Sequence, residues 1–317
     1  MTATVNSDTI IYPALMQTGY LERKQDNLNV FNAASASAIL LTNELVMGDY
    51  SASAFYKIGG SIAHRDVNSV AAVTNEKIAM DEMVGIKTPW KYGPYATTEE
   101  AFKRRGKSPA EFSMLIGQDM ADATAEGFIE FALGSLEAAI RANATMVTSG
   151  DLAVEGKKVL TKGLRTMGDK FGTVALWVMD SMAYLDIVDE SIDNKLFEEA
   201  GVVVYGGVPG TMGKPVLVTD QCPADTIFGL NQGAVTVKES QAPATRAYPI
   251  ENQENLAIGY RGEGTCNIEV LGYKWKDKAV TNPNPTALKN SSNWEKYATD
   301  NKATAGFIID LIDTVAP

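Results

Sequence analysis

The stretch SPAEFSMLIGQDMADATAEGFIEFALGSLEAAIRANATMV, residues 108–147, decides the fold of this chain. Ser108 can cap a helix, Pro109 suits the first helical position, and Glu111 lies three residues after the cap. We therefore predict one very long helix over about 109–147, which at 1.5 Å per residue would measure roughly 60 Å. Bulky residues recur at steps of three and four along it, which predicts a covered stripe: Phe112, Leu115, Ile116, Met120, Phe128, Phe131, Leu136, Ile140 and Val147.

Three glycines, Gly117, Gly127 and Gly134, interrupt this predicted helix. Each costs about 1 kcal/mol relative to alanine in a helix interior. We therefore expect a kink or the close approach of another backbone at these positions.

Length and composition are those of an ordinary globular protein. The chain has 317 residues, 45% apolar and 21% charged, which is enough for one large domain or two medium ones. A net charge of −11 argues against a protein whose main role is to bind phosphate backbones, although an acidic protein surface can still enclose DNA. Cys222 and Cys266 are isolated, so we expect two buried thiols in a reducing compartment.

The N-terminal third of the chain, before the long helix, contains segments with too little apolar surface to fold alone. Residues 1–47 are predicted to form an arm, with a helix-compatible patch over 12–20 and a run of small residues over 33–38. Residues 48–90 are predicted to form two extended strands joined by a polar tip near 64–75. Because a two-stranded hairpin is marginal in water, we interpret this segment as a loop that projects from the body and needs another surface.

The segment between the predicted hairpin and the long helix contains a Pro/Gly/aromatic turn over 90–95 and then a capping box of Thr97 and Glu100. This capping box would open a short helix, and a basic cluster follows. A solvated face is the default interpretation, and a contact with another subunit or with nucleic acid is the alternative. The cluster comprises Lys103, Arg104, Arg105 and Lys107.

After a break at 148–151, residues 151–250 alternate short helices and apolar strands, which predicts a compact α/β domain. Residues 254–276 predict a long hairpin that turns at 262–264 and lies along the long helix. The last apolar run, over 307–315, is predicted to return as a strand or a short helix. Residues 91–150 and 251–317 would then form one elongated domain together.

No residue pattern carries catalysis, a cofactor or a metal ion above background, so the sequence predicts none of these sites. The single histidine, His64, lies in the predicted polar tip, and neither H-E-x-x-H nor C-x-x-C occurs. The glycine-rich segment 206–214 lacks the spacing of a phosphate-binding loop, and Pro215 follows Lys214, so a connection between strands is the better interpretation. Acidic pairs such as Asp81/Glu82 are predicted to be solvated faces.

The order of these elements resembles the major capsid protein of tailed bacteriophages, which has the Hong Kong 97-type fold. That family has an N-terminal arm (here 1–47), an extended β-hairpin E-loop (48–90), a P-domain with a long spine helix (91–150 and 251–317), and an α/β A-domain (151–250). Local stretches are also similar to this family: ALWVMD at 175–180, GKPVLVTD at 213–220, IFGLNQGA at 227–234 and VLGYKW at 270–275. The resemblance therefore implies an α+β fold of this type.

The resemblance further implies a non-enzymatic virion protein that assembles in the host cytoplasm. It would form homo-pentamers and homo-hexamers of an icosahedral shell enclosing double-stranded DNA, with no membrane partner. A separate scaffolding protein, a portal and decoration proteins are the other partners implied. Lys57 and Lys77 lie in or beside the hairpin, but neither matches a cross-linking motif. Two alternatives stay open: an encapsulin-like compartment, and an α/β enzyme that uses the 206–214 loop.

Overall fold

The long helix predicted from the sequence is the axis of the molecule. The computed structural model describes residues 12–57, 62, 64–72, 78–104, 108–193, 213–250 and 254–312. In it, helix α3 spans Pro109–Arg141, and the Ser108 side chain accepts a hydrogen bond of 3.2 Å from the Glu111 backbone N–H. The predicted start is therefore confirmed. The helix ends before 147 because strand β4 (Val147–Gly150) pairs with the distant strand β13 (Gly306–Leu311).

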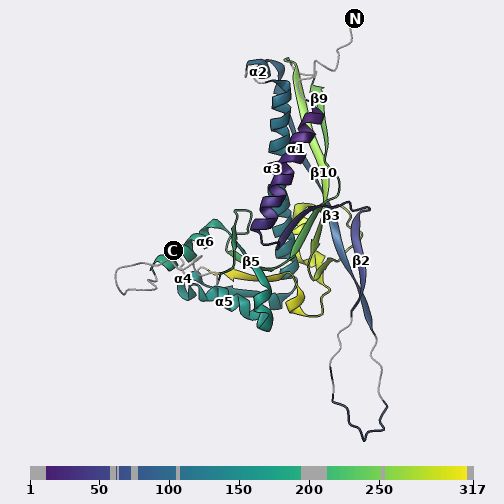
Figure 1. Ribbon diagram of the computed structural model, residues 1–317, viewed down its shortest axis with the longest axis vertical. Helices are drawn as coiled ribbons and strands as arrows, with labels where there is room; N and C mark the ends of the chain where they lie inside the picture. Colours follow the sequence, from purple (N-terminus) through teal and green to yellow (C-terminus); the bar gives the residue numbers. More distant parts are fainter. Residues whose placement is uncertain are drawn as a thin grey trace.

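Helix α1 (Pro13–Ala34) packs lengthwise on α3, as Figure 1 shows. Glycines on both helices permit this close approach. A Cβ atom at Gly117 of α3 would overlap the Met16 carbonyl oxygen, and one at Gly19 of α1 would lie 2.8 Å from the Met114 carbonyl oxygen. The close backbone approach predicted at Gly117 is confirmed. The described part of the predicted arm thus lies on its own chain.

The small-residue run after α1 makes a tight turn into strand β1 (Ile39–Asn43). Ala36 and Ser37 have φ angles of 48° and 57°, in the left-handed region. β1 pairs in parallel with β8 (Val235–Glu239) and buries Ile39 in the main core.

The larger sheet has six strands in the order β1-β8-β10-β3-β2, with β9 paired to β10. Two strands within it contradict the sequence predictions. β10 is one continuous strand over Ala257–Val270, so the predicted hairpin turn at 262–264 is wrong. β3 continues over Ala79–Thr98 with only a local irregularity at Gly93-Pro94, so the predicted turn at 90–95 is wrong as well. The other strands are β2 (Tyr50–Lys57) and β9 (Ala244–Ile250).

The glycines that suggested a turn in β10 instead make room for side chains. A Cβ atom at Gly264 would lie 2.6 Å from the Trp90 ring, and one at Gly262 would lie 2.6 Å from the Met120 sulfur. Both positions pair antiparallel with β3. These glycines therefore allow rings and a thioether to lie directly against the strand.

The smaller sheet has five strands in the order β4-β13-β7-β5-β6. It draws β4 and β13 from outside the predicted 151–250 domain, while β8 and β9 from that range belong to the larger sheet. The division into domains at these boundaries stays a prediction. The remaining strands and the flanking helices are β5 (Val174–Met179), β6 (Val216–Val218), β7 (Thr226–Asn231), α4 (Leu152–Glu155), α5 (Lys158–Leu164), the 3-10 segment Arg165–Thr173 and α6 (Ser181–Asp193).

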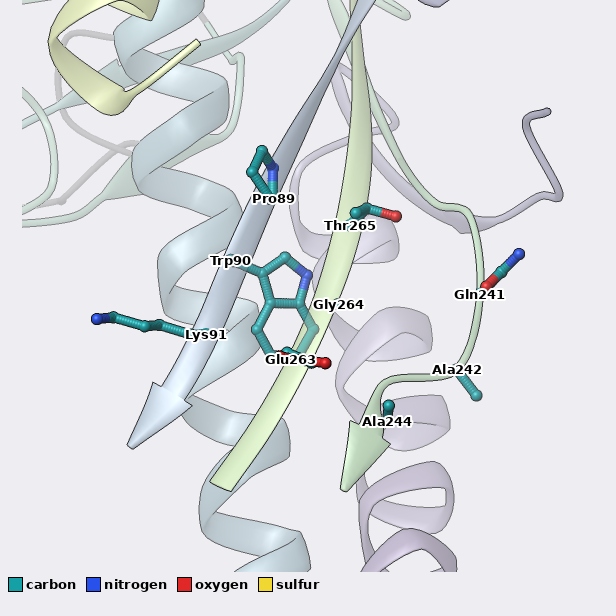
Figure 2. Close-up of a pocket in the computed structure, with 9 residues that line it drawn as sticks. All are labelled: Pro89, Trp90, Lys91, Gln241, Ala242, Ala244, Glu263, Gly264 and Thr265. Carbon is teal, nitrogen blue, oxygen red and sulfur yellow. The ribbon is translucent and has the colours of Figure 1, made fainter. Parts of the chain in front are cut away.

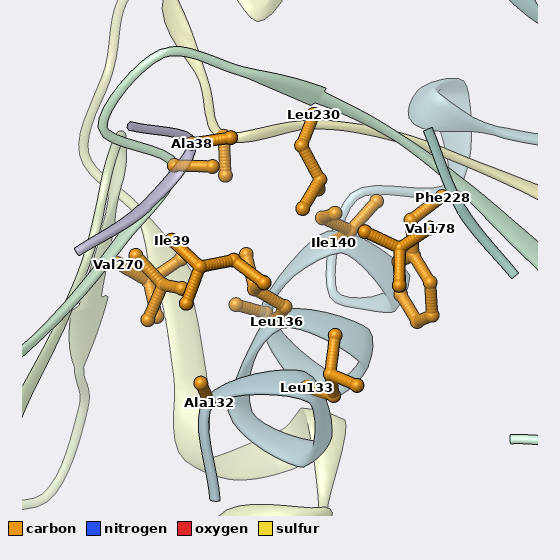
Figure 3. Packing of buried hydrophobic residues seen from close by; sticks show 14 of the residues in the cluster. Ala38, Ile39, Ala132, Leu133, Leu136, Ile140, Val178, Phe228, Leu230 and Val270 are labelled. Carbon is orange, nitrogen blue, oxygen red and sulfur yellow. The ribbon is translucent and has the colours of Figure 1, made fainter. Parts of the chain in front are cut away.

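One main core joins the two sheets to the C-terminal half of α3. Figure 3 shows Leu136 and Ile140 of α3 between Ile39 and Val270 of the larger sheet and Phe228 of the smaller one. A second, smaller cluster lies where α1 and the first half of α3 pack on β3 and β10. It comprises Met16, Tyr20, Tyr92, Ile116, Met120, Ala121 and Ile258.

Short elements complete the described structure: α2 (Glu99–Arg104), β11 (Tyr273–Trp275), α7 (Pro285–Leu288) and β12 (Trp294–Lys296). β11 and β12 pair with each other, and Trp275 and Trp294 meet edge to face at 5.3 Å. Within the described ranges, no helix is long and apolar enough to span a membrane.

Candidate assembly surfaces

The hairpin of β2 and β3 leads away from the body of the molecule (Figure 1). It exposes large apolar side chains that a folded chain normally covers: Tyr56 is 69% exposed and Met80 is 73% exposed. The described residues beyond the strands have the same character, because Ile62, Val67, Val70 and Ile78 are all exposed. The projecting hairpin predicted from the sequence is confirmed in its described parts.

The base of this hairpin is held to the body by ion pairs. The Lys274 ammonium lies 2.7 Å from Asp81, and the Lys278 ammonium lies 2.6 Å from Glu82. Burial raises the pKa of Asp81, but the hydrogen bond from Lys274 and nearby cations outweigh it, so that its pKa lies below the ordinary value. The prediction of a solvated face is therefore wrong for Asp81, whereas Glu82 is exposed as predicted. The sequence could not show it, because the two lysines follow nearly 200 residues later.

A polar network fixes the first strand of the hairpin to the sheet. The Ser51 hydroxyl donates to Glu269 at 2.7 Å, and Asn267 donates to Ser51 at 3.2 Å. Glu269 also pairs with Lys238 at 3.2 Å. A Cβ atom at Gly85 would lie 2.5 Å from the Glu269 side chain, so this network occupies the space over Gly85.

A second buried polar group ties α1 to the larger sheet. Lys24 forms an ion pair with Glu239, and the Tyr20 hydroxyl donates to Glu239 at 2.9 Å. Burial lowers the pKa of Lys24 to about 8. Breaking one partner of such a pair leaves a buried charge and is strongly destabilising, so this group secures the position of α1.

The carboxylates along α3 are held by partners within the chain. Asp122 pairs with Arg23 of α1 at 3.0 Å, and Glu130 pairs with Lys289 at 2.9 Å. Glu137 pairs with Arg141 at 2.9 Å, and Arg141 also reaches Asp310. Asp119 accepts from the Tyr92 hydroxyl and Glu126 from Gln221. These acids therefore orient neighbouring elements rather than forming a free acidic wall.

An open hollow of about 600 Å³ lies where the pairing of β10 passes from β8 to β9 (Figure 2). Trp90 borders it, and its indole N–H is buried with no hydrogen-bond partner in the described part of the chain. The charged residues that line it are Lys91 and Glu263, which are cross-strand neighbours. One cation and one carboxylate form neither a metal site nor a phosphate site.

The residues considered from the sequence as catalytic or metal-binding candidates do not form a reactive centre in the described structure. His64 is exposed, and the described residues contain no group of three His, Cys, Asp or Glu side chains that could hold a metal ion. Cys222 and Cys266 are buried and unpaired, as predicted. Burial raises the pKa of each thiol to about 12, so neither is an activated nucleophile.

The basic residues considered for phosphate binding, cross-linking or an intermolecular contact have partners within the chain where those partners are described. Lys214 donates to the Val174 carbonyl oxygen of β5, and burial lowers its pKa. It therefore supports a strand rather than facing a phosphate, while 206–212 lie outside the described residues. Lys57 lies 3.9 Å from Asp81, and Lys77 lies outside the described residues. In the basic cluster, Arg104 pairs with Glu100 at 2.9 Å, and Arg105 and Lys107 are not described.

A family model described as major capsid protein 13-like matches residues 8–308, which is nearly the whole chain. The chain belongs to this family of major capsid proteins. A shell-forming role follows from this membership, and it favours the phage coat protein over the encapsulin-like compartment. The search of curated proteins finds no match.

Solved structures agree on the fold of this major capsid protein. A chain of Microbacterium phage Oxtober96 is 9% identical with a TM-score of 0.53, and the match covers 75% of this chain and 84% of that one. A chain of Mycobacterium phage Adephagia is 8% identical with a TM-score of 0.53, covering 90% and 91%. Mycobacterium phage Cain gives 8% identity, a TM-score of 0.52 and coverage of 89% and 91%. The Hong Kong 97-type fold predicted from the sequence is confirmed.

Proposed function

We propose that this capsid protein assembles through homo-pentamers and homo-hexamers into an icosahedral shell around double-stranded DNA. Assembly takes place in the host cytoplasm without a membrane. The chain acts as a structural protein and not as an enzyme. A separate scaffolding protein, a portal and decoration proteins complete the particle. Family membership supports the coat role itself, and the finer statements are our inference from the sequence resemblance and the surfaces described above.

The observation that carries this proposal is the projecting apolar hairpin. Tyr56, Ile62, Val70 and Met80 are exposed on an element that its own chain does not cover. Burying such side chains contributes roughly 25 cal/mol per Å² of apolar surface, so a second copy that covers the hairpin is stabilised by it. A protein that functions as a monomer gains nothing from this exposure.

The net charge supports enclosure of DNA without specific binding. With a net charge of −11 the chain repels phosphate backbones overall, so it encloses a packaged genome without binding it tightly. Sequence-specific recognition would need base-reading side chains, and we propose none.

Electron microscopy of the purified chain tests the proposal. We expect closed shells or rings of five and six copies. A small oligomer that binds a nucleotide saturably would support the enzyme alternative and overturn the proposal, as would a chain that stays monomeric at high concentration. Particles isolated from infected cells should contain DNA, whereas a protein cargo would favour the encapsulin-like alternative.

Paired variants of the hairpin tip test whether its exposed apolar side chains mediate assembly. We expect Ile62→Asp with Val70→Asp to prevent assembly, because carboxylates replace the apolar contacts with a neighbour. Asn68→Asp with Ser69→Asp is the matched control, since it adds the same charge at polar tip positions and should still assemble. Both variants should unfold at the wild-type temperature. Equal assembly of the two variants would contradict a docking role for the apolar tip.

A further inference from the structure

Helix α6 presents a stripe that combines exposed apolar and acidic side chains. Met182 is 67% exposed, and Leu185, Asp186 and Asp189 are exposed beside it. Their spacing of three, four and seven residues from Met182 puts them on one side of the helix. Asp186 and Asp189 have no hydrogen bond or ion pair within the described part of the chain. We call these four residues the α6 face.

The segment 152–173 carries two exposed cations on α5, and its exposed apolar side chains are separated from them by backbone breaks at Gly156 (φ 56°) and Gly168 (φ 53°). Val154 is 75% exposed, Phe171 is 56% exposed, and the cations Lys158 and Arg165 are exposed between them. Lys158 and Arg165 are seven residues apart, about two helical turns, and point to the same side. Among the described residues neither has a carboxylate partner, unlike Lys162, which pairs with Glu155 at 3.1 Å. We call Lys158 and Arg165 the α5 face.

The two faces lie on opposite sides of the five-stranded sheet. Gly163 of α5 packs against Phe307 and Ile309 of β13, so α5 covers the side to which these two residues point. Val178 and Phe228 point to the other side, toward α3 (Figure 3). Figure 1 shows α6 and α5 on the two sides of this sheet. One chain therefore has an acidic face and a basic face that cannot meet each other.

We propose that the α6 face of one copy docks on the α5 face of the next copy. Asp186 and Asp189 meet Lys158 and Arg165 across the contact, and Met182 and Leu185 add apolar surface from the α6 face. Because the two surfaces differ, the contact is heterologous and repeats head to tail, which generates a ring when the rotation closes. This proposal rests on the proposed function, and it assigns the ring-forming contact to specific residues.

Charge reversal tests this contact in the full-length chain. Asp186→Lys with Asp189→Lys should abolish rings and shells, as should Lys158→Glu with Arg165→Glu, because like charges then face each other. Glu22→Lys with Asp26→Lys on exposed positions of α1 changes the net charge by the same amount as the first variant and should assemble. Circular dichroism should show the same unfolding temperature for all three variants.

Restoration by charge exchange separates a direct contact from a general charge effect. A chain that carries all four reversals should assemble again, because each contact regains opposite charges. A mixture of the two reversed chains should recover six-membered rings and not five-membered ones, because alternating copies cannot close an odd ring. Assembly by either reversed chain alone, or no recovery in the fourfold variant, overturns the contact. Failure of the wild-type chain to assemble would instead overturn the proposed function.

Discussion

Glycines in α3 differ in what surrounds them, although the sequence marks them alike. At Gly117 the α1 backbone lies so close that a Cβ atom would overlap the Met16 carbonyl oxygen. At Gly127 nothing lies within 4 Å of such an atom. The prediction of a kink or a close approach is confirmed at Gly117, whereas Gly127 has no packing reason of this kind.

Alanine substitutions should separate these two glycines. Gly127→Ala should raise the free energy of unfolding by about 1 kcal/mol, since alanine is the better helix former and has room. Gly117→Ala should lower it by about 1–3 kcal/mol, because overpacking against the α1 backbone outweighs that gain. Urea unfolding of the unassembled chain measures both. Stabilisation by Gly117→Ala would contradict the close packing of α1 on α3.

The sequence shows those residues whose partners are local. Ser108 caps α3 as predicted, because its partner Glu111 is three residues away. The pair of Lys24 and Glu239 carries no such signal, since more than 200 residues separate its members. Lys24 lies in the polar stretch ERKQDN at 22–27, so it looks like an exposed lysine until the fold brings its carboxylate near.

At the scale of elements, the two wrong turn predictions have one cause. Gly93-Pro94 in β3 and Gly262-Glu263-Gly264 in β10 are typical turn sequences. The two strands instead pair along most of their length, for example Gly264 with Trp90. Each strand supplies the hydrogen-bond partners that keep the other extended. A single segment contains no information on a partner about 170 residues away, so the long strands could not be predicted from local signals.

Acid should loosen the base of the β2–β3 hairpin. Because the pKa of folded Asp81 lies below its ordinary value of about 4, the ionised form contributes stability that is complete above about pH 4. That contribution is lost as the pH falls through the lower folded pKa. We therefore expect Asp81→Asn to destabilise the chain at neutral pH and to differ less and less from wild type below about pH 4.

Thermal unfolding of the unassembled chain between neutral and acidic pH measures this difference. Asp49→Asn is the control, since Asp49 is exposed and has no hydrogen bond or ion pair in the described structure. Its difference from wild type should stay small at every pH. A constant difference for Asp81→Asn across the whole range would rule out the ion pair with Lys274 as the cause.

The whole molecule combines a covered body with uncovered extensions, and the sequence indicated this arrangement. The order of arm, hairpin, long helix and α/β segment predicted the fold family correctly. The strands that make up the smaller sheet could not be predicted from local sequence, because β4 precedes residues 151–250 and β13 follows them. Ile308 pairs with Val147, and this long-range pairing ends the long helix earlier than its periodicity suggests.

Methionine oxidation should report which surfaces assembly covers. Peroxide should oxidise Met80 and Met182 in the unassembled chain, because both are largely exposed, and spare Met16 and Met120, which are buried. In assembled shells Met80 and Met182 should become protected, while the buried pair stays unchanged. Peptide mass spectrometry measures each site. Undiminished oxidation of Met80 in shells would show that the hairpin does not dock on a neighbour.

Strand β3 belongs at once to the exposed hairpin and to the sheet beneath α1 and α3. From Ala79 to Tyr92 it pairs without a shift of register and extends for roughly 45 Å at about 3.3 Å per residue, and the irregularity at Gly93-Pro94 lies beyond. A force applied to the hairpin is therefore transmitted along this paired strand to Tyr92 and the second apolar cluster. A neighbouring subunit that pulls on this loop thus also acts on the contact of α1 and α3 with the sheet.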